Sequence, residues 1–122
     1  MSLDFYDSNG TPIAYSDDGE HIYTFDGRPV AYLSQDSVYS FSGAHLGRFE
    51  TAMIRDNDGE VALFTEGATG GPPKPLRQLK PLKGLKQLKP LKGIKELQPL
   101  RPLPSSSWSR LSGEKFFGEV RA

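Results

Sequence analysis

The sequence has no cysteine and only two histidines, His21 and His45, among its 122 residues. The lack of cysteine excludes a disulfide framework and thiolate metal sites, and neither histidine has a second imidazole at ligand spacing. No apolar run approaches the ~20 residues that span a bilayer. The first residues also lack the basic and apolar regions of a signal peptide. These absences predict a cytoplasmic protein with no metal, no cofactor and no transmembrane segment.

The net charge of zero hides two oppositely charged segments. Residues 1–73 contain 3 basic and 12 acidic side chains, a net charge of −9, whereas residues 74–104 contain 9 and 1, a net charge of +8. Such a basic segment can lie on the acidic part of its own chain, or it can bind an external polyanion. We favour the internal arrangement, because the two charges match and are covalently linked.

Four short repeats occupy the acidic segment. Their central glycines recur at nearly equal intervals, and each has an apolar residue five positions earlier and an apolar–small pair after it. The glycines are Gly10, Gly27, Gly43 and Gly59. A short repeat with β-branched and aromatic residues around an Asn-Gly, Asp-Gly or Ser-Gly step predicts a β-hairpin with a tight primed turn.

Four hairpins must share one core, because a single hairpin is marginally stable. A small residue recurs four positions after each of the first three glycines and three positions after the fourth, namely Ala14, Ala31, Gly47 and Ala62. Their recurrence indicates a crowded centre, so we predict an all-β fold in which four hairpins are arranged radially with approximate four-fold symmetry.

The basic segment has a period of three. An aliphatic residue stands at every third position from Leu76 to Leu103, and Lys or Arg follows nearly every one. This period fits neither an α-helix nor a strand, and the many prolines oppose both. We predict a polyproline II-like tail, with three residues per turn and with its leucines more buried than its lysines.

A straight tail would measure roughly 90 Å at ~3.1 Å per residue, whereas a compact domain of this size is about 28 Å across. The tail can therefore wrap the domain, fold back on itself or cross sister subunits, with bends expected at Gly84 and Gly93. A disordered basic linker is the other alternative. The residues that follow the tail include Trp108, Phe116 and Phe117, which indicate a docked anchor. In this anchor Ser112 is expected to cap one helical turn and Gly118 to end it.

These segments predict three units: a hairpin domain at 1–67, the tail at 68–104 and the anchor at 105–122. Together, the four aromatic-rich hairpins, the GATGGP junction at 67–72, the period-three tail and the Ser-Trp-Ser and Phe-Phe sequences near the end resemble the four-fold beta-flower family of small bacterial proteins. The resemblance implies a β domain with four-fold internal organisation and no established activity, so it implies no catalytic residue.

The residues themselves give no support to a catalytic or metal site. No nucleophile stands at a recognisable turn, and the acidic run from Asp56 to Glu60 lacks calcium-loop spacing, so a type I′ turn explains it better. One position, four residues before each glycine, holds Tyr6, Tyr23, Tyr39 and Arg55. In a radial fold these side chains form a ring, which either packs against neighbouring residues or binds a ligand.

We therefore expect no enzyme, but a structural or protein-interaction module whose tail packs on itself, on the acidic domain or on sister subunits. A homo-oligomer is expected, because the core is small and the tail is long. The alternative is a protein that binds nucleic acid or an anionic lipid surface through a polyanion edge formed by Lys80, Lys83, Lys86, Lys89, Lys92 and Lys95.

Overall fold

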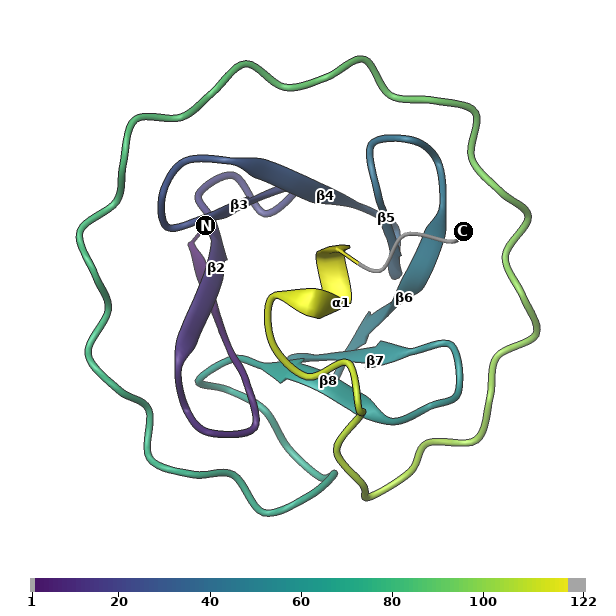
Figure 1. Cartoon of the computed structure of the whole chain (residues 1–122). Coiled ribbons are helices and arrows are strands. Elements are labelled where there is room, and N and C mark those ends of the chain that lie inside the picture. Colours follow the sequence, from purple (N-terminus) through teal and green to yellow (C-terminus); the bar gives the residue numbers. More distant parts are fainter. Residues whose placement is uncertain (1, 119–122) are drawn as a thin grey trace.

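The computed structural model describes residues 2–118 and contains eight antiparallel strands in a closed barrel (Figure 1). The last four residues of the predicted anchor lie outside the described residues. Each strand pairs with the next along the chain, and β1 closes the barrel by pairing with β8 through Tyr6 and Phe64. The strands are β1 (Leu3–Tyr6), β2 (Pro12–Ser16), β3 (His21–Thr24), β4 (Pro29–Ser34), β5 (Ser37–Tyr39), β6 (His45–Glu50), β7 (Met53–Asp56) and β8 (Val61–Phe64). The predicted all-β fold of four hairpins is confirmed.

The barrel core pairs a large side chain with a small residue in successive hairpins. Phe5 faces Ala14, Ile22 faces Ala31 and Val38 faces Gly47 across the strand pairs. The side chains of this core are fully buried, which is how a narrow barrel fills its interior. At Gly47 no side chain fits, since an added Cβ would lie 2.0 Å from the carbonyl oxygen of Arg55.

The turn at the tip of each hairpin differs from the predicted primed turn. Only the glycine has a positive φ, +88° at Gly59 for example, whereas a type I′ turn needs two such residues. The side chain of the residue three positions before the glycine stabilises this turn instead. In the fourth hairpin Asp56 Oδ1 accepts hydrogen bonds from the backbone N–H groups of Asp58 and Glu60. The type I′ assignment for Asp56–Glu60 was therefore wrong.

The C-terminal segment 105–118, which we call the plug, packs against the barrel core. Helix α1 (Lys115–Gly118) lies over the centre of the barrel in Figure 1, and Phe116 and Phe117 join the cluster that contains Phe5 and Ile22. Ser112 does not cap this helix, because its Oγ accepts a hydrogen bond from the backbone N–H of Ser8. The anchor thus ties the end of the described chain to its beginning.

The segment 74–104, which we call the belt, contains neither helix nor strand and runs around the outside of the barrel (Figure 1). Of the predicted paths, the structure shows wrapping. A circle about 28 Å across has a circumference of about 88 Å, which matches the ~90 Å estimated for the tail. Polyproline II geometry for the belt stays a prediction.

Candidate functional site

The belt meets each hairpin tip once, at intervals of nine residues. At each meeting an N–H of the belt, or that of Ser105 directly after it, donates a hydrogen bond to the carbonyl oxygen of a tip glycine, at 2.8–3.0 Å. The four bonds join Gln78 to Gly10, Gln87 to Gly27, Glu96 to Gly43 and Ser105 to Gly59. The chain therefore advances nine residues from one hairpin to the next, and this spacing repeats the four-fold symmetry of the barrel.

Glycine is required at the tips for contact with the belt as well as for the turn. At Gly27 the φ angle is +96°, and an added Cβ would lie 1.9 Å from the carbonyl oxygen of Leu85. The belt glycines Gly84 and Gly93 serve the reverse contact. A Cβ on Gly93 would lie 2.4 Å from Ser42 O, and its N–H donates to Phe41 O. At Gly84 and Gly93, where we expected bends, the structure shows close approach to the hairpins and no positive φ.

Basic side chains of the belt lie over aromatic rings on the outer surface of the barrel. Lys83 Nζ is 4.3 Å from the centre of the Tyr15 ring, and Lys92 Nζ is 4.4 Å from that of Tyr32. Each ring stacks on a neighbour in the adjoining hairpin, as Tyr15 does on Tyr23. A cation over an aromatic face is attracted by the negative face of the π system. The tyrosine rings on the barrel surface therefore attract the belt cations electrostatically.

The predicted ring of Tyr6, Tyr23, Tyr39 and Arg55 lies at equivalent places under the belt, and all four residues are buried. Arg77, Lys86 and Lys95 lie over the three tyrosines at 4.9–5.9 Å from the ring centres. The fourth position reverses the pattern. Arg55 Nη1 donates to the carbonyl oxygens of Gly59 and Ser105, and the belt residue in step with the three cations is Pro104. The barrel therefore supplies the cation at this fourth position, whereas the belt supplies it at the other three.

Carboxylates of the barrel hold the belt cations from the other side. Asp17 lies 3.1 Å from Lys83 Nζ and 2.9 Å from Lys86 Nζ, and hydrogen bonds from Lys86 and Lys83 hold the pKa of Asp17 below its usual value. Other pairs join Lys80 to Asp4, Lys92 to Glu20, and Arg101 to Asp36 and Glu50. The opposite charges of the two segments are therefore paired within the chain.

The lysines of the predicted polyanion edge do not form one free edge. Lys80, Lys83, Lys86 and Lys92 each have a carboxylate partner, and Lys95 lies over Tyr39. Lys89 is exposed, and within residues 2–118 no acidic side chain lies at ion-pair distance from it. The nearest equivalent of Asp4 in the second repeat is His21, which explains this exception.

The prediction that the leucines are more buried than the lysines was wrong. The ten aliphatic side chains of the belt are 88–96% exposed, whereas the side chains of Lys80 and Lys92 are 49% and 38% exposed. The physical reason is the surface beneath the belt, where tyrosine faces and carboxylates hold cations. The lysines therefore turn toward the barrel, and the leucines turn away from it.

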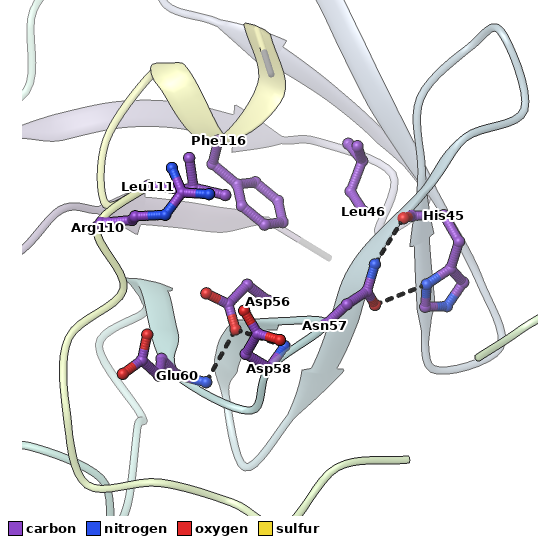
Figure 2. Close-up of a pocket in the computed structure, with 9 residues that line it drawn as sticks. All are labelled: His45, Leu46, Asp56, Asn57, Asp58, Glu60, Arg110, Leu111 and Phe116. Carbon is purple, nitrogen blue, oxygen red and sulfur yellow. Dashed lines mark hydrogen bonds between the residues drawn. The ribbon is translucent and has the colours of Figure 1, made fainter. Parts of the chain in front are cut away.

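A pocket of about 140 Å³ lies between the fourth hairpin and the plug (Figure 2). Arg110 and Phe116 from the C-terminal segment lie across it from the acidic turn that contains Asp56 and Asp58. Asp56 is engaged, since its Oδ2 accepts a hydrogen bond of 2.6 Å from Ser109 Oγ. Within residues 2–118 no cluster of side chains is suited to hold a metal ion.

His45, at one side of this pocket, connects Asn57 to Ser37. His45 Nδ1 lies 2.9 Å from Asn57 Oδ1, and Nε2 lies 3.0 Å from Ser37 Oγ. The order Ser–His–Asn resembles that of nucleophilic hydrolase sites. Here Ser37 is fully buried, and the belt residue Gln98 donates to its Oγ at 2.7 Å. Burial lowers the pKa of His45, so the ring is held neutral as a connector between barrel and belt.

Sequence reasoning missed this connector, because its members share no motif and Gln98 lies 61 residues from Ser37. It also missed the partners of the belt cations. The signal for the latter was present: the near-copies PLKGLKQLK and PLKGIKELQ repeat every nine residues, one block for each hairpin repeat. The ring of the other histidine, His21, lies with its Nδ1 at hydrogen-bond distance, 2.7 Å, from Asp18 Oδ2.

Within residues 2–118 no helix has the length and apolar character needed to cross a membrane. Searches of curated proteins and of solved structures found no match. A family model described as 4-fold beta flower protein matches residues 3–117, which include all eight strands, the belt and most of the plug. With four hairpins around one axis and a match over nearly its whole length, the chain belongs to the 4-fold beta flower family.

Proposed function

We propose that this chain is a non-catalytic structural or protein-interaction module in which the barrel serves as the support for the belt. The observation that carries the proposal is the set of four hydrogen bonds that the belt and the adjoining Ser105 donate to the tip glycines. Fixing the whole belt in an extended path costs conformational entropy, which the paired cations and backbone bonds offset. The product of that ordering is an outward-facing row of leucines.

The polar groups of the chain also support a non-catalytic role. His45 bonds to Ser37, which is buried as His45 is, and to the exposed Asn57, so the hydrogen-bonding capacity of its ring is used within the protein. A general base or nucleophile must reach the atom on which it acts, within about 2.6–3.2 Å. Ser37 is fully buried beneath Gln98, where an external substrate has no access to it.

Amide hydrogen exchange of the full chain tests whether the belt is docked in solution. The N–H groups of Gln78, Gln87 and Glu96 donate to hairpin carbonyls and should exchange at least tenfold more slowly than those of Leu79 and Leu88. The matched amides lie on the same belt, so sequence composition is controlled. Uniformly fast exchange along the belt would contradict the proposal and favour a linker.

The alternative function, polyanion binding through the lysine edge, has weaker support, because most of these lysines have partners on the barrel. It predicts retention of the full chain on duplex DNA or anionic vesicles that falls steeply with added salt. Retention at low salt that disappears in Lys89→Gln would favour it over the module.

A further inference from the structure

The outer edge of the belt is an unbroken row of ten aliphatic side chains, each 88–96% exposed. They are Leu76, Leu79, Leu82, Leu85, Leu88, Leu91, Ile94, Leu97, Leu100 and Leu103. Ten side chains of this size carry roughly 600–1,200 Å² of apolar surface. The largest apolar patch on a typical monomer is about 300–600 Å² and is often functional. A row of this size indicates a surface that another molecule covers.

We propose that the leucine row joins copies of this chain edge to edge, with the leucines of one belt inserted between those of the next. The inference deepens the proposed function by naming the partner, and it rests on the docked belt. Each copy acts as a disc whose rim carries the contact and whose two faces stay free.

The spacing of the row suits contact between two copies. Successive leucines are three residues apart, or about 9 Å along an extended chain. This interval leaves a gap beside each leucine that one leucine of another belt can enter, so the row is complementary to itself. The two residues between successive leucines contact the barrel where the structure shows it, as Lys83 over Tyr15 and Gly84 at Phe25 O do, so they are turned away from these outer gaps.

The charge distribution also favours contact between copies. The chain has a formal net charge of zero, so two copies experience no long-range repulsion. Locally, Lys83 and Lys92 are turned to tyrosine rings and carboxylates of their own barrel. The contact line between two rims therefore does not bring these like charges face to face.

A lipid layer fits the row less well. The hydrocarbon core of a bilayer is about 30 Å thick, and a belt one side chain deep covers only a small part of that thickness. The belt residues next to the leucines form exposed charged pairs with Asp4, Asp17 and Glu50, which a bilayer would have to desolvate.

The circular shape determines what kind of assembly results. Two convex rims touch along a short arc, about two or three leucines on each copy at the ~9 Å spacing. One such contact is smaller than the ~1,200 Å² of a stable standard interface, so a pair of copies is weak. The remaining leucines stay available, and each copy can hold several neighbours, which produces open assemblies in place of a closed dimer.

Two triple variants of the full chain test the proposal, each replacing three leucines by glutamine. Leu79→Gln, Leu88→Gln and Leu97→Gln spread the change around the ring, whereas Leu82→Gln, Leu85→Gln and Leu88→Gln confine it to one arc. In sedimentation velocity between about 10 μM and 1 mM, we expect the wild type to associate. The spread variant should weaken association at least tenfold, and the confined variant should retain small assemblies through its intact arcs.

A second measurement needs no variant. Association through leucines should strengthen in sodium sulfate, which promotes apolar burial. A wild type that stays at 13.5 kDa up to the highest concentration, or that dissociates in sulfate, would overturn the proposal. Equal association of all three proteins, or binding of a monomer to neutral phosphatidylcholine vesicles, would overturn it too. If exchange at Gln78 and Gln87 remains slow in these cases, only the choice of partner fails, and the docked belt stands.

Discussion

The ammonium group of Lys83 lies 4.3 Å from the centre of the Tyr15 ring. The same relationship returns nine residues along the belt and one hairpin around the barrel, where Lys92 lies over Tyr32 at 4.4 Å. The repeat of this contact shows that the belt is held by matching periods. A shift of the belt by one residue would remove the lysines from the rings, because a leucine or a glycine such as Gly84 would take their place.

Replacing a belt lysine that contacts a ring should destabilise the protein. Lys83→Gln removes the cation over Tyr15 and the ion pair with Asp17, and we expect a loss of about 0.5–1 kcal/mol in the free energy of unfolding. Lys89→Gln is the matched control, expected to change stability by less than about 0.5 kcal/mol. Urea titration measures both, and equal losses would contradict the assigned role of Lys83.

A methyl group at a hairpin tip should displace the belt. Gly27→Ala combines a positive φ of +96° with a Cβ only 1.9 Å from Leu85 O, so we expect a loss of about 2–5 kcal/mol. Gly70→Ala separates the two effects, because Gly70 has a φ of +78° but no atom within 4 Å of the added Cβ. Its loss should stay near about 1–2 kcal/mol.

The belt itself provides a second readout for the same substitution. In Gly27→Ala, exchange at the Gln87 amide should accelerate strongly, while the Gln78 amide at the neighbouring tip should remain protected. If Gln87 stayed protected, the close approach at Gly27 would not be what positions the belt.

Stability should fall on mild acidification because of His45. Its burial lowers its pKa below the ordinary 6.5, so the unfolded chain binds the proton more readily than the folded one. The free energy of unfolding therefore decreases as the pH falls below about 6.5, until the pH drops below the folded-state pKa. His45→Gln cannot titrate and should show a flatter profile in thermal melts over this range. An unchanged slope would place the acid sensitivity elsewhere.

The plug should contribute more than any single belt contact. Phe116 is 1% exposed in the barrel core, and Phe116→Ala should cost about 3–5 kcal/mol. Lys115→Ala changes the exposed neighbour in the same short helix, and we expect less than about 0.5 kcal/mol. Chemical denaturation of the full chain compares the two. Similar midpoints would show that the helix does not close the core.

Most of the fold could be predicted from the four repeats in the sequence. The four glycines and the small residues after them predicted hairpins around a crowded centre, and Ala14 and Ala31 lie there. The turn type was less visible, because a side chain such as that of Asp56 decides it. The strand connection at Thr51 and Ala52 has two consecutive positive φ values, although it contains neither glycine nor asparagine. Tertiary closure of the barrel overrides local preference at that point.

The candidate site was predictable only in its parts. Charge complementarity correctly indicated that the belt could lie on the acidic segment, but the orientation of its leucines was wrong. Hydrophobic period alone assumes that apolar groups face inward. Here the tyrosines beneath the belt attract Lys83 and Lys92, and those aromatic faces are visible only after the strands have been paired. The connector of Ser37, His45 and Gln98 is likewise assembled by the fold from distant residues.

The nine-residue step of the belt ties the length of the belt to the number of hairpin repeats. Each hairpin repeat corresponds to one nine-residue step, as the contacts of Leu76, Leu85, Ile94 and Leu103 with successive tips show. Gene changes that alter one segment alone leave a belt too short to reach the plug or too long to lie flat. A descendant with five hairpins would need the duplication of a whole hairpin at one place in the gene and the insertion of nine belt residues at another. The number of hairpins and the number of belt steps must therefore change together in evolution.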